Sequence, residues 1–126
     1  MQRLEWESAP VNAGNADRIS ILWTGAMGYI TQPPGSFTMY LNEHPLLDLG
    51  VSLSSRVCGS ADGRTELLFD VPHASGQDAF GVFYLTVPAS MLEEGHPARL
   101  SVTGSDSKSL RWFRVFDYTD TIEHED

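Results

Sequence analysis

The side chains best suited to nucleophilic, acid–base or metal chemistry in this sequence are four histidines and one cysteine. The histidines lack the i, i+4 spacing that places two imidazoles on one helical face for zinc, and they fall in separate turns: His44, His73, His96 and His124. Cys58 has no second cysteine for a disulfide and no nearby histidine to activate it. The triplet Gly59-Ser60-Ala61 lacks the rest of a nucleophile elbow. The sequence therefore predicts no catalytic residue, no metal site and no enzyme activity.

Acidic side chains allow two further kinds of chemistry, and both depend on arrangement in space. Glycosidases use two carboxylates at a defined separation, which sequence neighbours such as Glu93 and Glu94, or Glu5 and Glu7, do not reveal. A calcium ion needs several oxygen ligands from one loop, but the candidate aspartates lack EF-hand spacing: Asp48, Asp62, Asp78 and Asp117. We interpret them as solvated loop residues. We expect no cofactor, with a structural calcium ion as the alternative.

Aromatic side chains provide the remaining chemical signal, because the flat C–H faces of sugars stack on aromatic rings. Tyr40 and Tyr84 lie on the polar parity of segments whose other parity is apolar. Trp112 lies in a run, residues 110–116, with apolar side chains on both parities, so its side is ambiguous; a central strand packed on both faces explains it without a ligand. We predict that the three rings line one continuous carbohydrate-binding surface. Asn42 and Arg114 would supply hydrogen bonds at its edge.

The elements that must hold these residues are strands. Apolar and polar side chains alternate with a period of two along most of the chain, as a half-buried strand requires. Trp6 and Trp23 are expected in the core, together with one parity of several segments: Phe37, Met39, Leu41, Leu67, Phe69, Phe83, Leu85, Leu100 and Val102. About eight strands separated by turn signals predict an all-β, antiparallel jelly-roll β-sandwich.

The connections between strands are also suggested by the sequence. Residues 88–92 are expected to form one helical turn, and residues 43–45 a turn after the strand at 36–42. The polar stretch 104–108 predicts a hairpin that joins strands at 99–103 and 109–118. We assign residues 1–118 to a single β-sandwich domain and residues 119–126 to an acidic tail or the start of a linker.

Composition excludes some partners. The 126 residues include 17 acidic and 8 basic side chains, for a net charge of -9. Nucleic acid binding needs a basic surface, and an anionic membrane repels an acidic one, so we expect neither partner. No apolar run is long enough to span a membrane, and the first residues have no signal-peptide pattern.

Three segments together are similar to a known family. They are residues 37–47 (FTMYLNEHPLL), 81–88 (GVFYLTVP) and 92–102 (LEEGHPARLSV). They resemble the galactose-binding-like jelly rolls that occur as accessory domains of carbohydrate-active enzymes. The chain departs from the family pattern at Glu43, where a turn glycine is usual, and at Pro97, where an asparagine is usual.

The resemblance implies a non-catalytic carbohydrate-binding or accessory module of a larger, secreted glycan-processing enzyme, which would place the domain outside the cell or in a periplasm. Its partner would then be a glycan. The first alternative is a structural interaction module that packs against a neighbouring domain without binding sugar. A small stand-alone β-sandwich enzyme is the second.

Overall fold

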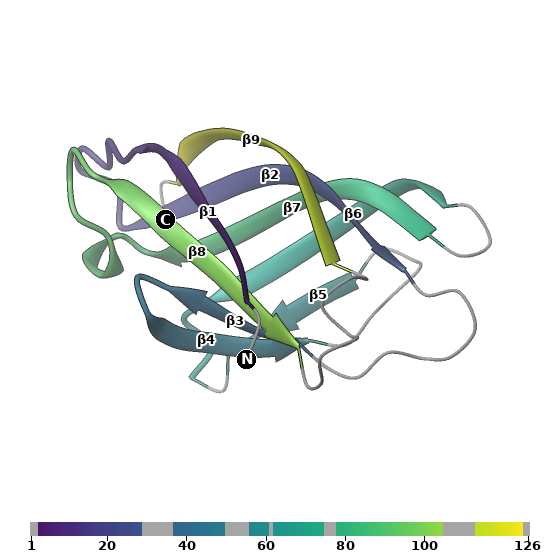
Figure 1. Cartoon of the computed structure of the whole chain (residues 1–126). Helices are drawn as coiled ribbons and strands as arrows, with labels where there is room; N and C mark the ends of the chain where they lie inside the picture. The colour runs from purple at the N-terminus through teal and green to yellow at the C-terminus, as the bar shows by residue number, and fades with distance from the viewer. Residues whose placement is uncertain are drawn as a thin grey trace.

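The fold is described from a computed structural model, which describes residues 3–28, 37–49, 56–60, 62–74, 78–104 and 113–124. These residues form nine strands and one short 3-10 turn, η1 (Figure 1). The elements are β1 (Arg3–Pro10), β2 (Arg18–Gly28), β3 (Phe37–Leu41), β4 (His44–Leu49), β5 (Arg56–Gly59), β6 (Glu66–Ala74), β7 (Asp78–Pro88), η1 (Ala89–Met91), β8 (Pro97–Gly104) and β9 (Phe113–His124).

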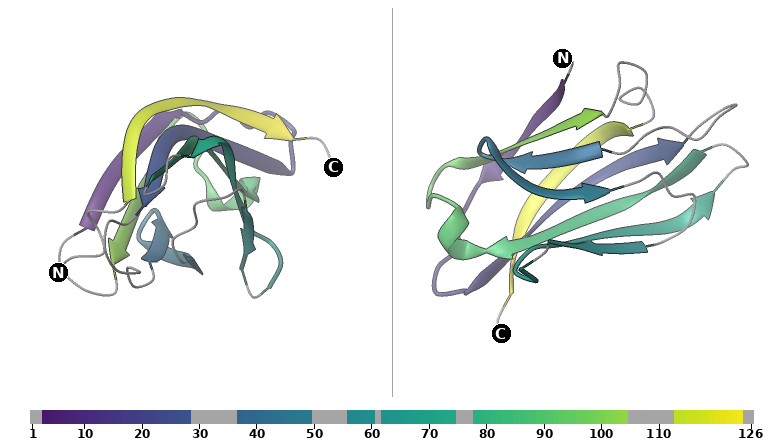
Figure 2. Two further views of the ribbon diagram at one scale, coloured as in Figure 1. Left: turned by 90° about the vertical axis from the view of Figure 1, so that its right-hand side faces the viewer. Right: turned by 90° about the horizontal axis from the view of Figure 1, so that it is seen from below.

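The strands form two sheets, in the orders β1-β8-β3-β4 and β5-β6-β7-β2-β9. Every pairing within the described residues is antiparallel. Figure 2 shows the five-stranded sheet curving over the four-stranded one. The predicted all-β sandwich is therefore confirmed. Because β1, β3, β4 and β8 belong to one sheet and β2, β5, β6, β7 and β9 to the other, the chain passes between the sheets five times; the jelly-roll connection itself stays a prediction.

The core lies between the two sheets, and all nine residues predicted for it from alternation are buried. Trp6 and Trp23 are buried as well, and their ring centroids lie 5.2 Å apart in an edge-to-face contact. Trp23 stacks on Phe83 at 5.2 Å, and Phe83 stacks on Phe69 at 4.2 Å. These four aromatic rings connect β1, β2, β7 and β6 across the sandwich. Aromatic pairs in such geometries stabilise the fold beyond the contribution of their buried area.

Two predicted connections differ from the structure. Strand β8 does not form a hairpin with β9; it pairs with β1 on one edge and β3 on the other, which leaves it no free edge. Strand β9 instead pairs with β2 in the opposite sheet. It continues to His124, with Ile122 opposite Ser20, so residues 119–124 belong to the sandwich rather than to a tail. A polar edge strand and a polar tail have similar composition, and only the pairing distinguishes them.

The short connections lie closer to those predicted from the sequence. The helical turn predicted at residues 88–92 is present as η1, and Met91 and Leu92 pack partly buried against the core. The turn after β3 lies earlier than predicted. It consists of Asn42 and Glu43, both in the left-handed backbone region (φ 48° and 72°), as in a type I′ hairpin.

Candidate functional site

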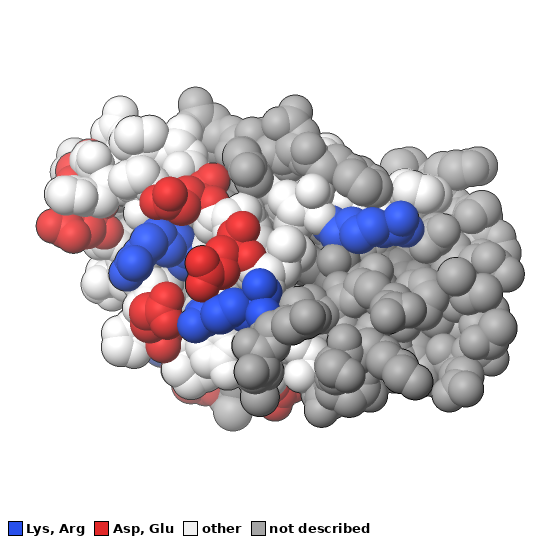
Figure 3. Space-filling model, viewed as in Figure 1, with Lys and Arg blue, Asp and Glu red and all other residues white. Residues whose placement is uncertain are grey.

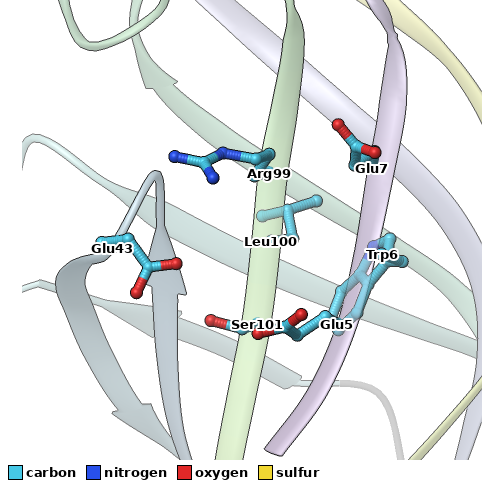
Figure 4. A pocket seen from close by; sticks show the side chains of 7 residues that line it. All are labelled: Glu5, Trp6, Glu7, Glu43, Arg99, Leu100 and Ser101. Carbon is cyan, nitrogen blue, oxygen red and sulfur yellow. The ribbon is translucent and has the colours of Figure 1, made fainter.

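The outer face of the four-stranded sheet carries a polar hollow. Alternation directs Trp6 and Leu100 toward the core, so their neighbours Glu5, Glu7 and Arg99 face outward. Acidic and basic side chains gather there, interspersed over β1 and β8 (Figure 3). The close-up in Figure 4 shows the hollow, whose floor is β8 and whose walls are β1 and the β3–β4 turn.

The β3–β4 turn is attached to the floor of this hollow. The Asn42 N–H donates to the Arg99 carbonyl oxygen at 2.8 Å, and the Asn42 Oδ1 accepts from the Arg99 N–H at 3.0 Å. Asparagine tolerates a positive φ better than most residues, so one side chain supports both the turn and its attachment to β8. The turn then carries the Glu43 carboxylate over the hollow.

Arg3 connects side chains of β1, β8 and the β3–β4 turn on this face. Its guanidinium lies 3.2 Å from a Glu5 carboxylate oxygen and 3.2 Å from one of Glu43, and it also donates to the Ser101 hydroxyl. The same guanidinium lies over the Tyr40 ring, 5.5 Å from the centroid. Arg3 therefore offsets two of the three carboxylates near the hollow and covers one face of the Tyr40 ring.

Arg99 and Glu7 occupy the centre of the face and are opposite each other across β8 and β1. Opposite charges at such positions usually interact. Yet within the described residues neither side chain forms an ion pair or hydrogen bond, and both are exposed. Figure 4 shows the Arg99 guanidinium directed toward the β3–β4 turn and away from Glu7. The site therefore presents five guanidinium N–H donors and a carboxylate acceptor to solvent.

A second hollow adjoins the first. Each has a volume of about 540 Å³, and both are lined by Glu7 and Arg99. The second is bounded by the turn and by the stretch that runs from η1 to the first residue of β8, which contributes Ser90, Met91, Leu92, Glu93, His96 and Pro97. The His96 Nε2 lies 3.3 Å from a Glu93 carboxylate oxygen. We call the two hollows together the β8 groove.

The structure separates the residues predicted for a carbohydrate site. Tyr40 lies in β3 of the four-stranded sheet and Asn42 in the turn between β3 and β4, which borders the β8 groove. Tyr84 and Arg114 belong to the five-stranded sheet, and Tyr84 faces outward because Phe83 and Leu85 are buried. Tyr40 and Tyr84 thus lie on opposite outer faces, and the predicted continuous surface is wrong for this pair. Trp112 lies outside the described residues.

The outer face of the five-stranded sheet carries a different surface. Pairing register aligns four partly or fully exposed side chains across β5, β6, β7 and β2 in the order Val57, Leu68, Tyr84, Leu22. Val57 is 57% exposed, and Phe80, further along β7, is 38% exposed. We call these four aligned side chains the apolar row.

The residues considered for catalysis and metal binding lie apart. The structure describes the side chains of His44 and His96, both exposed, while Cys58 packs partly buried against the core. Asp48 accepts from the Thr38 hydroxyl at 2.7 Å, and Asp62 accepts from Ser60. No three His, Cys, Asp or Glu side chains of the described residues gather as metal ligands. The side chains of Asp78 and Asp117 lie outside the described residues, so the calcium alternative stays a prediction.

Among the residues that the structure describes, Asp62 has a carboxyl group with a lowered pKa. The Ser60 hydroxyl donates to the Asp62 Oδ1 at 2.6 Å, and the Arg64 N–H donates to the same oxygen at 3.0 Å. These two hydrogen bonds lower the pKa of Asp62, and the bond from Ser60 has the larger effect. They hold the carboxylate within the β5–β6 turn. In the described part of the chain, no helix has the length and apolar character needed to cross a membrane.

Sequence reasoning did not identify Arg3, Glu7, Glu43 and Arg99 as a group. Their outward direction was readable, since Glu5 and Glu7 flank Trp6 and Arg99 precedes Leu100. Their proximity was not, because it depends on β8 pairing between β1 and β3.

Comparisons of the chain with protein-family models, with curated proteins and with solved structures found no match. The likeness to galactose-binding-like domains therefore stays a prediction from the three segments that carry it.

Proposed function

We propose that this domain is a non-catalytic carbohydrate-binding module and that the β8 groove is its binding site. The observation that carries the proposal is the exposed Arg99 guanidinium, directed away from Glu7 and without a partner among the described residues. A sugar hydroxyl both donates and accepts hydrogen bonds. Arg99 supplies donors and Glu7 supplies an acceptor, so the hydroxyls of a bound sugar chain can pair with each of them.

The surroundings support binding to a neutral polyhydroxyl ligand. Arg3 forms ion pairs with both Glu5 and Glu43, so its single positive charge partly offsets their negative charge, and Arg99 and Glu7 place one positive and one negative group at the centre of the groove. Hydrogen bonds to charged groups contribute more than neutral ones, about 1.5–3 kcal/mol each. Tyr40 supports the site from below by packing with Arg3 rather than by stacking on a sugar, because Arg3 lies over its ring.

The proposal is tested by titrating the domain with soluble polysaccharides and by comparing two arginine variants. Arg99→Gln removes the charge and most donors, so its affinity should fall about tenfold or more, as the loss of one charged hydrogen bond implies. Arg64→Gln is the matched control, since Arg64 is also exposed but lies in the turn between β5 and β6. Both variants should keep the wild-type melting temperature. Equal weakening by both, or no binding by the wild type, would refute the proposal.

A specific observation favours a second function, that of an interaction module. The apolar row and Phe80 place exposed apolar area on the outer face of the five-stranded sheet, opposite the groove. Contiguous apolar surface of this kind marks contact with another protein. In a longer protein that contains this domain, covalent labelling of Tyr84 and Phe80 should be weaker than in the isolated domain. Equal labelling in both would exclude packing through this face.

A further inference from the structure

The β8 groove has two hollows that meet at one pair of residues. Arg99 and Glu7 line both. Along β8, the lining residues run from Ser101 in the first hollow to Pro97 in the second. Four residue steps of a strand span about 13 Å. The groove is thus elongated along β8, with the Glu7–Arg99 pair near its middle.

Both hollows have a mainly polar lining with some apolar surface, and they differ in the side chains that supply it. In the first, Arg3 holds Glu5 and Glu43, the Ser101 hydroxyl lies on the floor, and Trp6 and Leu100 are the apolar lining residues. In the second, Met91, Leu92 and Pro97 are the apolar lining residues, beside Glu93 and His96. Apolar side chains suit the C–H face of a sugar ring, and charged side chains suit its hydroxyl edge.

We infer that these hollows are two subsites for a neutral oligosaccharide chain, which crosses the Glu7–Arg99 pair and is bound along its length rather than at its end. This inference rests on the proposed function. The hollows have equal volumes of about 540 Å³, so a single ring in one leaves the other empty. Arg3 forms ion pairs with two carboxylates of the first hollow, whereas an acidic sugar would meet the Glu7 carboxylate at the junction.

The test measures affinity for cello-, xylo-, manno- and malto-oligosaccharides of one to six units by calorimetry, with oligogalacturonates as the acidic series. We expect affinity in one neutral series to rise about tenfold or more from the monosaccharide to the length that fills both hollows, then to stay level. Borohydride reduction of the chain end should leave the affinity of the longest chain unchanged, because the end is not bound.

Two variants separate the subsites. Glu43→Asn changes the first hollow and keeps a residue that tolerates a positive φ, while Ser90→Phe fills the second hollow from an exposed position. Each should flatten the dependence of affinity on chain length, whereas Arg99→Gln should weaken every length.

The possible outcomes separate failure of the two-subsite inference from failure of the proposed carbohydrate-binding function. Arg99-dependent binding that is as tight for a monosaccharide as for a hexasaccharide, that is lost on end reduction, or that prefers the acidic series would overturn the two-subsite inference and leave the carbohydrate module standing. If no saccharide in any series binds, the proposed function fails, and this inference fails with it.

Discussion

The turn formed by Asn42 and Glu43 makes a sharp prediction, because its backbone conformation and its hydrogen bonds can be separated by mutation. The left-handed region destabilises a residue that has a Cβ by about 1–2 kcal/mol, whereas glycine adopts it without strain and asparagine tolerates it. The bond from the Arg99 N–H to the Asn42 Oδ1, 3.0 Å long, contributes a further 0.5–1.5 kcal/mol, roughly the net value of one hydrogen bond. Asn42→Ala should therefore cost about 1.5–3.5 kcal/mol, and Asn42→Gly about 0.5–1.5 kcal/mol.

Urea unfolding followed by tryptophan fluorescence measures both values, since Trp6 and Trp23 are buried in the core. The neighbouring position is an internal control. Glu43→Gly and Glu43→Ala both remove the ion pair with Arg3, but only glycine relieves the positive φ of 72°, so the glycine variant should be the more stable. Equal stabilities of Asn42→Ala and Asn42→Gly would show that the left-handed turn, and with it the position of Glu43 over the groove, is wrong.

Three other predictions concern the fold. Leu41→Ala should cost about 2–5 kcal/mol of unfolding free energy by denaturant titration, because Leu41 is 1% exposed; a cost near zero would contradict its place in the core. Gly81→Ala should cost about 1–3 kcal/mol, since a Cβ there would collide with the carbonyl oxygen of Asp70, and an unchanged melting temperature would disprove that close approach. The pKa of Asp62 is lowered mainly by the Ser60 hydrogen bond, so its stabilising effect is present above the unfolded carboxyl pKa and is lost as pH falls through the lower folded value. The stability difference between wild type and Asp62→Asn should accordingly shrink in acid, and a difference independent of pH would contradict it.

Tyr40 and Tyr84 do not share a face, so the proposed glycan site depends on other residues. Tyr40 packs beneath Arg3, and Tyr84 lies on the opposite side of the sandwich in the apolar row. The two functions weighed from the sequence therefore map to different faces of one domain. A glycan would bind the polar face around Arg99, and a neighbouring domain would pack on the apolar row.

The sequence by itself determined which side chains enter the core. A strand turns successive side chains to opposite sides, so alternation alone separates Phe37, Met39 and Leu41 from Thr38 and Tyr40. It also located the helical turn at η1, which is set by a few adjacent residues. Both features are local, and local sequence contains enough information to specify them.

Only the tertiary structure decided which strands are neighbours. The stretch after β8 has the composition of a hairpin loop, but β1 and β3 already occupy both edges of β8, so β9 pairs with β2 instead. Alternation predicted that Tyr40 and Tyr84 point outward, but it did not show which sheet each residue belongs to. Glu7 and Arg99 could likewise be recognised as exposed charges but not as neighbours. Their proximity arises from the hydrogen bonding of strands that are distant in sequence.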